Sequence, residues 1–250
     1  MNTEKFTGKA DNYEKYRPSY PKEFLDYLYG EVGFFGEKTI ADIGAGTGKL
    51  TELLLQRKSF VYAVEPNADM REKLTEKFSG ISNFSIVSAP AESTELPAQS
   101  VDFITVAQAF HWFDAEKFKA ECRRILKPGG KVVLVWNSRD ERSEIVKAYD
   151  EVCFKFGSAF KGAGSGGRGK KVDEYADFYG GKIEHRVFDN IIPLTLERFI
   201  GDVASKSYAP NENDANFPPL KAALTELFEK YKEDNILKMP FFTMSYLGEV

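Results

Sequence analysis

Short runs of apolar, β-prone residues alternate along the first half of the chain with segments whose apolar residues recur every three or four positions. The runs predict strands and lie at residues 39–43, 60–65, 84–87, 101–107 and 131–136. The segments between them predict helices, because each would carry one apolar face. Their apolar positions include Leu50, Leu53, Leu54, Met70, Leu74, Phe78, Phe118, Cys122, Ile125 and Leu126. Strands that alternate with helices predict an α/β fold with a doubly wound, mostly parallel sheet.

The two ends of the chain have a less regular pattern. Before the first strand, Phe24, Leu25 and Leu28 predict a short helix that ends at Gly30. Beyond residue 137 the expected elements are a helix around 145–152, a sixth strand over 183–192, a helix over 220–231 and a last strand over 241–247. This C-terminal part forms either a helical cap over an acceptor pocket or a plain helical layer.

The composition bounds the domain organisation. A chain of 250 residues that is 42% hydrophobic can bury a large core, so a single domain is expected over 1–250. Within it we distinguish an N-terminal arm with the first helix (1–37), a core (38–137) and C-terminal strands with the cap (138–250). A net charge of −4 and a pI near 5.5 give no general basic surface, which disfavours nucleic acid as a partner.

Cysteine and histidine are scarce. The cysteines Cys122 and Cys153 and the histidines His111 and His185 show no paired metal-ligand spacing, which argues against a disulfide framework and against a metal site. The N-terminus lacks the apolar core of a signal peptide, and no run of about 18 apolar residues occurs. A soluble, cytoplasmic protein without a membrane partner is therefore expected.

A glycine-rich turn follows the strand predicted at 39–43. Gly44, Gly46 and Gly48 stand at alternate positions directly before a predicted helix. Glycine lets the backbone adopt conformations that other residues avoid and lets a ligand approach the main chain. The helix that follows presents unpaired N–H groups and its positive dipole end to that ligand. The turn is therefore a candidate binding site for a small polar or anionic ligand.

The spacing of this turn disfavours two common nucleotide motifs. A P-loop would need a glycine at position 43 and a hydroxyl at position 50, where the chain has Ile43 and Leu50. The dinucleotide fingerprint would need its third glycine at position 49, where the chain has Lys49. Both a P-loop enzyme and a nicotinamide or flavin enzyme are therefore disfavoured.

The pattern Asp-x-Gly-x-Gly-x-Gly over 42–48 resembles motif I of the Rossmann-like (class I) S-adenosylmethionine-dependent methyltransferases. Two further segments resemble the same family, one over 91–102 and the run Arg-Ile-Leu-Lys-Pro-Gly-Gly-Lys over 124–131. Near the first, Ala89 and Ala98 depart from the common form, which has Gly and Asp. The resemblance implies a sheet of seven strands whose last strand is antiparallel, helices on both faces, and S-adenosylmethionine as the cofactor.

The resemblance also implies how the first two strands hold that cofactor. Asp42, Gly44 and Gly46 would shape the pocket for its methionine part. Glu65 follows the second strand, 21 positions after Gly44, and would accept hydrogen bonds from the ribose hydroxyls. The alternative for Glu65 is a solvated acid or the cap of the next helix.

Further cofactor contacts are carried over from the same family. Ala91 and Glu92 would flank the adenine, and Ala107 and Gln108 would close on the methionine part. Arg17 belongs to a Tyr-Arg-Pro-Ser-Tyr-Pro element over 16–21 that occurs in one methyltransferase subgroup and lies there beside the methionine end. Arg17 would then approach the methionine carboxylate.

The fourth predicted strand runs into Gln-Ala-Phe-His-Trp-Phe-Asp over 108–114. Open α/β sheets bind ligands at the carboxyl ends of their strands, so His111 and Trp112 are expected to line the acceptor pocket. His111 would act as the general base if the acceptor has a proton to lose, and would only orient an acceptor that is already a carboxylate. The alternative is a buried His–Trp core pair.

The N-terminal arm contains interleaved aromatic residues, among them Tyr20. The arm either packs its rings on the domain or closes as a lid over the site, and Tyr20 is the lid residue in the second case. A glycine-rich basic loop spans 157–171 and is interpreted as a connector. Its alternative role is a clamp for an anionic acceptor through Lys161, Arg168, Lys170 or Lys171.

These features together predict an enzyme that transfers a methyl group to a small-molecule acceptor. The run over 108–114 resembles small-molecule methyltransferases, including relatives of trans-aconitate methyltransferase, and so indicates a small acid or another small metabolite. Motifs of nucleic-acid methyltransferases are absent from the expected places in the sequence. The alternatives are a non-catalytic S-adenosylmethionine sensor or interaction module, and a nicotinamide oxidoreductase. A monomer or homodimer is expected.

Overall fold

The computed structural model describes residues 15, 17–156, 175–204, 206, 209–210 and 213–250. Tyr16 and the basic loop 157–171 lie outside the described residues, so the roles predicted for them stay predictions.

A seven-stranded sheet forms the centre of the molecule, with the strand order β3-β2-β1-β4-β5-β7-β6. The strands are β1 (Thr39–Ile43), β2 (Phe60–Val64), β3 (Phe84–Val87), β4 (Val101–Ala107), β5 (Leu126–Arg139), β6 (Glu184–Leu194) and β7 (Leu237–Gly248). β1 to β5 pair in parallel, whereas β7 pairs antiparallel with both β5 and β6. The predicted doubly wound sheet with an antiparallel last strand is therefore confirmed.

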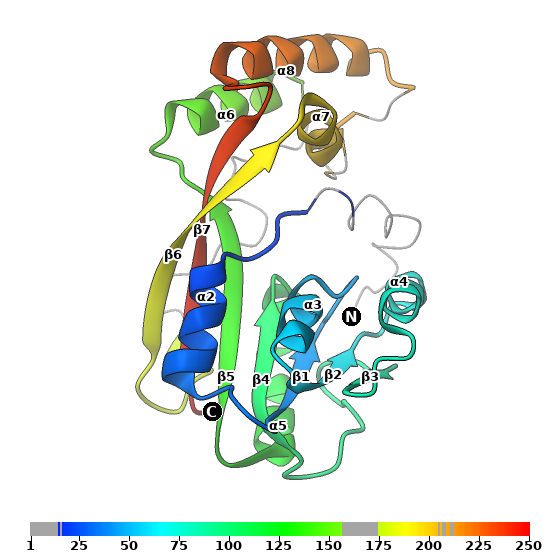
Figure 1. Cartoon of the computed structure of the whole chain (residues 1–250), viewed down its shortest axis with the longest axis vertical. Coiled ribbons are helices and arrows are strands. Elements are labelled where there is room, and N and C mark those ends of the chain that lie inside the picture. The colour runs from blue at the N-terminus through cyan, green and yellow to red at the C-terminus, as the bar shows by residue number, and fades with distance from the viewer. Residues whose placement is uncertain (1–14, 16, 157–174, 205, 207–208, 211–212) are drawn as a thin grey trace.

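Helices pack on both faces of this sheet (Figure 1). The helices are α2 (Lys22–Tyr27), α3 (Lys49–Gln56), α4 (Ala68–Phe78), α5 (Ala115–Ile125), α6 (Glu144–Phe156), α7 (Leu196–Ala204) and α8 (Phe217–Tyr231). Apolar side chains of α2, α3 and α4 share buried clusters with one face of the sheet, and those of α5 share a cluster with the other face. The spacing of apolar residues in the sequence thus predicts which side of each of these helices is buried.

Several predicted boundaries are wrong by a few residues; the last strand, for example, begins at Leu237 and not at 241. The first helix does not end at Gly30, because α2 continues as a π-helical turn over Leu28–Val32 and ends at Gly33, which has φ +97°. β5 begins at Leu126 and not at 131, because Leu126 already pairs with Val101 across an irregularity in the register. Gly30 is thus accommodated inside the first helix, and the Pro-Gly-Gly run over 128–130 is accommodated inside β5.

A second hydrophobic cluster lies beyond the end of β5. The hairpin of β6 and β7 extends past Arg139, and its outer part pairs Ile192 with Met239 and Leu194 with Leu237. These strand ends share a core with α6, α7 and α8, which we call the helical cap. Figure 1 shows the cap above the carboxyl ends of the parallel strands. The predicted C-terminal helices therefore gather on the side of the sheet that carries the candidate site.

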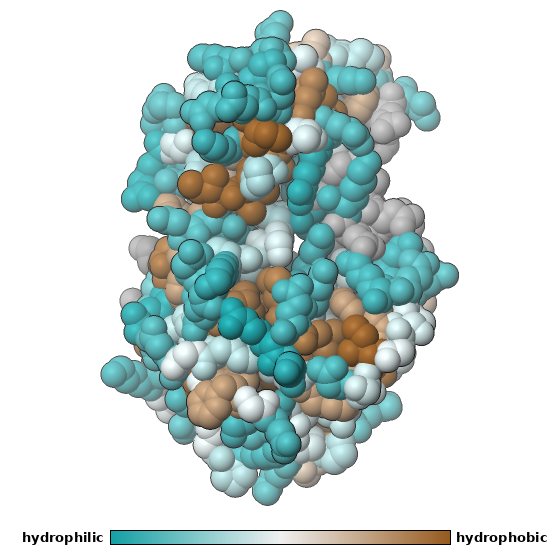
Figure 2. Space-filling model, viewed as in Figure 1, coloured by the Kyte–Doolittle hydropathy of each residue, from teal (hydrophilic) through white to brown (hydrophobic). Residues whose placement is uncertain are grey.

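On the face drawn in Figure 2 hydrophilic residues predominate, and hydrophobic residues reach the surface only in patches. Among the residues that the structure describes, no helix combines the length and the apolar character needed to cross a membrane.

Candidate functional site at the carboxyl edge of the sheet

The glycine turn has the backbone that the sequence predicts. Gly44, Gly46 and Gly48 all have positive φ, at 69°, 58° and 82°. The N–H of Gly44 donates to the carbonyl of Val64 (2.8 Å), which ties the turn to the end of β2. A Cβ added to Gly44 would lie 2.7 Å from the Cβ of Ala109. The turn therefore has no room for a side chain on the side where it meets the segment after β4.

Asp42, two residues before Gly44, joins the elements that flank the glycine turn. Its side chain is buried, and its two carboxylate oxygens accept hydrogen bonds from the hydroxyls of Thr51 (2.6 Å) and Thr105 (2.9 Å). Burial raises the pKa of Asp42 from 3.8 to about 6, although both hydroxyls oppose that shift. Asp42 thus fixes α3 and β4 around the turn, which is how it can shape a pocket.

The raised pKa of Asp42 predicts a pH dependence. A carboxyl group whose pKa is higher in the folded protein than in the unfolded chain stabilises the fold at low pH, and this contribution is lost as the pH rises through about 6. A shift of about 2 units corresponds to about 3 kcal/mol. Compared with wild type, Asp42→Asn should therefore gain relative stability between pH 4 and pH 7 in urea unfolding followed by circular dichroism. Parallel pH profiles for the two proteins would contradict the assignment, and the exposed Glu52→Gln on α3 serves as the control.

Glu65 lies directly after β2 and joins two parts of the site. One carboxylate oxygen accepts the N–H of Gly46 (2.9 Å) and the other accepts the N–H of Asn67 (2.9 Å). Burial raises the pKa of Glu65, and the two N–H groups oppose that rise. Each carboxylate oxygen can accept more than one hydrogen bond. The geometry is therefore compatible with a ribose that hydrogen-bonds the same carboxylate beside the glycine turn.

The loop after β3 carries Ala91, which is buried, and Glu92, which is half-buried. Glu92 accepts the N–H of Asp114 (2.8 Å), and Asp114 itself caps α5 by accepting the N–H of Lys117 (3.2 Å). The loop predicted to flank the adenine is therefore attached to the start of α5.

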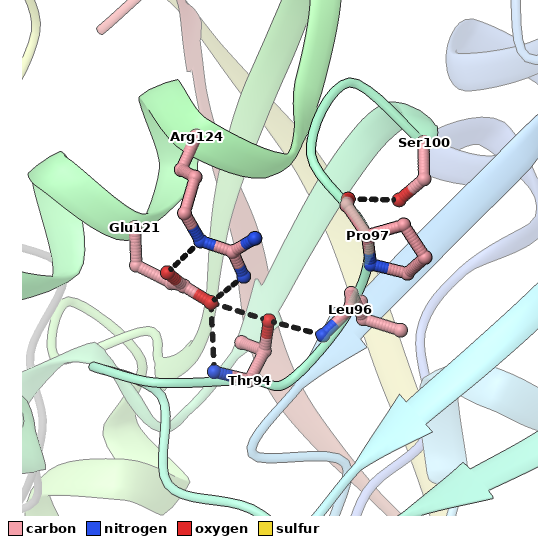
Figure 3. Close-up of polar contacts among 6 residues, drawn as sticks. All are labelled: Thr94, Leu96, Pro97, Ser100, Glu121 and Arg124. Carbon is pink, nitrogen blue, oxygen red and sulfur yellow. Dashed lines mark hydrogen bonds and ion pairs between the residues drawn. The ribbon is translucent and has the colours of Figure 1, made fainter.

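A second attachment of the same loop was not predicted from the sequence. Figure 3 shows Glu121 of α5 accepting both the N–H (2.7 Å) and the hydroxyl (2.6 Å) of Thr94. Arg124 donates to both oxygens of the same carboxylate, at 2.7 Å each. Arg124 and the hydrogen bonds of Thr94 together hold the pKa of Glu121 below its usual value, against the effect of burial. The only sequence signal is the Glu-x-x-Arg spacing, which also occurs on ordinary helix surfaces.

The end of β4 carries a backbone distortion. Gln108 has φ +59°, which is uncommon for a residue other than glycine. Its N–H donates to the carbonyl of Val135 (2.9 Å), and its side-chain amide donates to the carbonyl of Asn137 (3.1 Å). Ala107, the residue before Gln108, is half-buried and packs against the hydrophobic cluster that includes side chains of α2 and α3. Gln108 therefore links the ends of β4 and β5 at the same edge as the glycine turn.

His111 and Trp112 form a short 3₁₀ turn, Phe110–Trp112, after that distortion. Trp112 is 39% exposed and His111 is also exposed, so the alternative of a buried core pair is wrong. The two rings lie 4.7 Å apart between centroids. Desolvation lowers the pKa of His111, so the neutral imidazole predominates at pH 7 and can accept a proton.

The N-terminal arm crosses the ends of the C-terminal strands. The carbonyl of Ser19 accepts the side-chain amides of Asn137 (3.1 Å) and Asn190 (2.9 Å). Tyr20 is half-buried and packs its ring 6.0 Å from that of Phe24. The arm is therefore attached to β5 and β6 at Ser19, and a lid function of Tyr20 stays a prediction.

A buried ionic cluster lies where the arm meets the cap. Arg139, at the end of β5, donates to one carboxylate oxygen of Asp202 on α7 (2.8 Å), and Lys206 donates to the other (2.7 Å). The guanidinium of Arg139 lies over the rings of Tyr149 (4.2 Å) and Phe241 (5.1 Å). This cluster, too, was not predicted from the sequence, because Arg139 is distant along the chain from Asp202 and Lys206.

Arg17 belongs to the same electrostatic environment. Burial, together with Arg17 and Arg139, lowers the pKa of Lys206 to about 7, and Asp202 opposes them. Burial would raise the pKa of Asp202, but Lys206, Arg139 and Arg17 together hold it below its usual value. The structure therefore places Arg17 close enough to the cap to act on α7, and its predicted contact with the methionine carboxylate stays a prediction.

No group of three or more His, Cys, Asp or Glu side chains in the described part of the chain could hold a metal ion. Cys122 and Cys153 are buried, and neither forms a disulfide in the described part of the chain. Burial raises the pKa of Cys122 well above its usual value. Neither cysteine is placed to act as a nucleophile.

The described edge combines parts that suit an adenosine-containing ligand. It has a glycine turn at the N-terminus of α3, a carboxylate at the end of β2, a fixed loop after β3 and an imidazole after β4. The backbone amides and the carboxylate suit polar and hydroxyl groups. The buried loop and exposed aromatic residues can cover the rest of such a ligand.

Comparison with known proteins assigns the family. The sequence profile described as a methyltransferase domain matches residues 41–134. An uncharacterised methyltransferase of Mycobacterium tuberculosis is 39% identical over 147 residues, which are 59% of this chain and 58% of that protein. An uncharacterised methyltransferase of Geobacillus kaustophilus is 31% identical over 155 residues, which are 58% of this chain and 71% of that protein.

A solved structure shows the same fold over nearly the whole chain. It is described as a putative type II methyltransferase from Anaeromyxobacter dehalogenans and is 20% identical, with a TM-score of 0.63. The superposition covers 94% of this chain and 98% of that one. The profile match, the relatives and the sheet topology agree, so the chain belongs to the Rossmann-like S-adenosylmethionine-dependent methyltransferases.

Proposed function

We propose that this chain binds S-adenosylmethionine along the carboxyl ends of β1 to β4 and transfers its methyl group to a small-molecule acceptor. The observation that carries the proposal is the position of Glu65, whose carboxylate joins the N–H of Gly46 in the glycine turn to the N–H of Asn67. The match to the curated relatives spans little more than half of their length, so the reaction of the whole protein is part of this proposal.

The residues at the edge fit the parts of the cofactor. Glu65 would hold the ribose, the glycine turn with Asp42 below it would hold the methionine part, and Ala91 and Glu92 would flank the adenine. Gln108 would close the pocket from the end of β4. The cofactor supplies a methyl group on a positively charged sulfur, which is already activated for displacement.

The protein then has to align the acceptor and to exclude water. The acceptor would lie between the edge of the sheet and the helical cap, beside His111 and Trp112. The neutral imidazole of His111 would take the proton from a hydroxyl, amine or thiol acceptor and would only orient a carboxylate. Because few side chains take part in the transfer itself, binding and orientation account for most of the expected effects of substitutions.

Calorimetric titration with S-adenosylhomocysteine, S-adenosylmethionine and NADH tests the cofactor. Wild type should bind both adenosyl compounds. Glu65→Ala should weaken this binding by about 100-fold, because hydrogen bonds to a charged group contribute about 1.5–3 kcal/mol each. Circular dichroism checks that the variant is folded.

A matched control uses Glu76→Ala, an exposed acid on α4 whose side chain pairs with Lys73. It should bind both adenosyl compounds as wild type does. If wild type binds neither adenosyl compound and binds NADH, the proposed cofactor is rejected. Equal affinity of wild type and Glu65→Ala would reject the role of Glu65.

A further inference from the structure

The buried ionic cluster brings together three cationic side chains around one carboxylate in the described part of the chain. Arg139 comes from β5, Asp202 from α7, Lys206 from the residues after α7, and Arg17 from the N-terminal arm. The side chains of Arg139, Asp202 and Lys206 are only 8%, 8% and 11% exposed. Charged groups are rarely buried to this extent unless something opposes the cost of removing them from water.

The cluster borders the proposed methyl-transfer site. Arg139 follows Asn137 by two residues on β5, so the two side chains share one face of the strand and stand about 7 Å apart along it. The carbonyl of Asn137 holds the side chain of Gln108, and its amide holds the arm at Ser19. The edge of the sheet that carries the cofactor residues is thus continuous with the cluster.

The geometry of Arg139 is that of a fixed anion-binding group. The rings of Tyr149 and Phe241 lie against its guanidinium, and Asp202 binds one of its nitrogens. A guanidinium held in one plane presents donors that match the oxygens of a carboxylate or phosphate. Lys206 adds a second cation on the other oxygen of Asp202. Two cations that converge on one buried carboxylate favour a further negative charge in their vicinity.

We propose that Arg139 and Lys206, with Arg17 from the arm, form a subsite in the cap that binds an anionic oxygen group of the methyl acceptor, such as a carboxylate. This inference rests on the proposed function, because it places the acceptor beside the cofactor edge. It assigns the charged end of the acceptor to the cap and leaves the methylated atom near His111. The acceptor class is then a small anionic metabolite.

The cluster has a property that makes the subsite measurable without turnover. Lys206 is largely neutral at about pH 8, because burial, together with Arg17 and Arg139, lowers its pKa to about 7. A bound anion would oppose these effects, as Asp202 already does, and would raise the pKa of Lys206. Binding at this pH must then take up a proton from the buffer, and the observed binding enthalpy must change with the ionisation enthalpy of the buffer.

The experiment uses the whole protein saturated with S-adenosylhomocysteine. Succinate, citrate and inorganic phosphate are titrated calorimetrically at about pH 8 in two buffers of different ionisation enthalpy, with succinamide as the neutral probe. We expect at least one of the anions to bind with proton uptake and succinamide not to bind. Binding of succinate or citrate would identify a carboxylate as the recognised group, and binding of phosphate alone would identify a phosphate.

Variants separate an anion subsite from a cluster that only joins the arm to the cap. Arg139→Gln should weaken anion binding by about 10- to 100-fold, the range expected for lost charged hydrogen bonds. Lys206→Met should abolish the proton uptake. Arg142→Gln is the matched control, because Arg142 lies just beyond β5, is exposed and pairs with Asp140. It should behave as wild type.

Three results would overturn the inference. They are the absence of anion binding to the saturated wild type at millimolar concentrations, unchanged anion affinity in a folded Arg139→Gln protein, and proton uptake that persists in Lys206→Met. Failure of S-adenosylhomocysteine to saturate the protein would instead count against the proposed function. Because saturation is measured first, the two failures are distinguishable.

Discussion

Replacing Gly44 by alanine is expected to remove measurable binding of S-adenosylhomocysteine and to lower the free energy of unfolding by about 2–5 kcal/mol. Gly44 has φ +69°, a conformation that costs a residue with a Cβ about 1–2 kcal/mol. The new Cβ would also lie 2.7 Å from Ala109 and 3.2 Å from the ring of Phe113. Relief of that overlap must displace either the glycine turn or the segment that carries Gln108 and His111. Urea unfolding and calorimetric titration measure the two effects.

Gly80→Ala is the matched control for the change at Gly44. Gly80 also has positive φ, at 83°, but a Cβ there would meet nothing within 4 Å. Its substitution should cost only the conformational part, about 1–2 kcal/mol, and should leave binding unchanged. The prediction is contradicted if both variants lose the same stability and both still bind. The segment after β4 would then move away from the new Cβ without a measurable loss of stability, and the turn would not be rigid.

Replacing Asp202 by asparagine is expected to lower the free energy of unfolding by about 3 kcal/mol or more. Asp202 is the carboxylate that Arg139 and Lys206 share, and all three side chains are buried. Its neutralisation leaves the cations without that charge, and the pKa of Lys206 should fall further because Asp202 is the group that raises it. Thermal and urea unfolding at neutral pH measure the loss.

Glu197→Gln provides the comparison on the same helix. Glu197 is exposed and pairs with Lys15, and ion pairs at the surface contribute little. Its melting temperature should match that of wild type. An Asp202→Asn protein as stable as Glu197→Gln would mean that the cluster is hydrated, and would remove the electrostatic basis of the anion subsite.

The sequence predicts the parallel half of the fold because each element there has a local signal. The strands at 39–43, 60–65 and 101–107 are β-prone runs between helices with one apolar face, and the structure places them within a residue of the prediction. Glu65 follows in the same way, since the end of the second strand and its distance from Gly44 fix its place beside the turn.

Contacts between distant elements could not be predicted from one sequence. Arg139 and Asp202 are 63 positions apart, and nothing in either segment indicates that β5 and α7 will meet. The attachment of Thr94 to Glu121 depends in the same way on a loop that folds back onto α5. The early end predicted for the first helix has a different cause, because Gly30 tolerates the helical backbone and Gly33 is the residue that turns left-handed.

The pairing of Leu194 with Leu237 has a consequence for how such an enzyme can change over evolution. These residues close the outer end of the β6–β7 hairpin, so the excursion 195–236, which contains α7, Lys206 and α8, leaves and rejoins the sheet at adjacent points. Because these two points are adjacent, a change in the length of the excursion does not by itself shift the pairing of β6 with β7. Under the proposed function, residues that contact the acceptor could therefore vary within one continuous piece of the gene, while β1 to β5 keep their pairing.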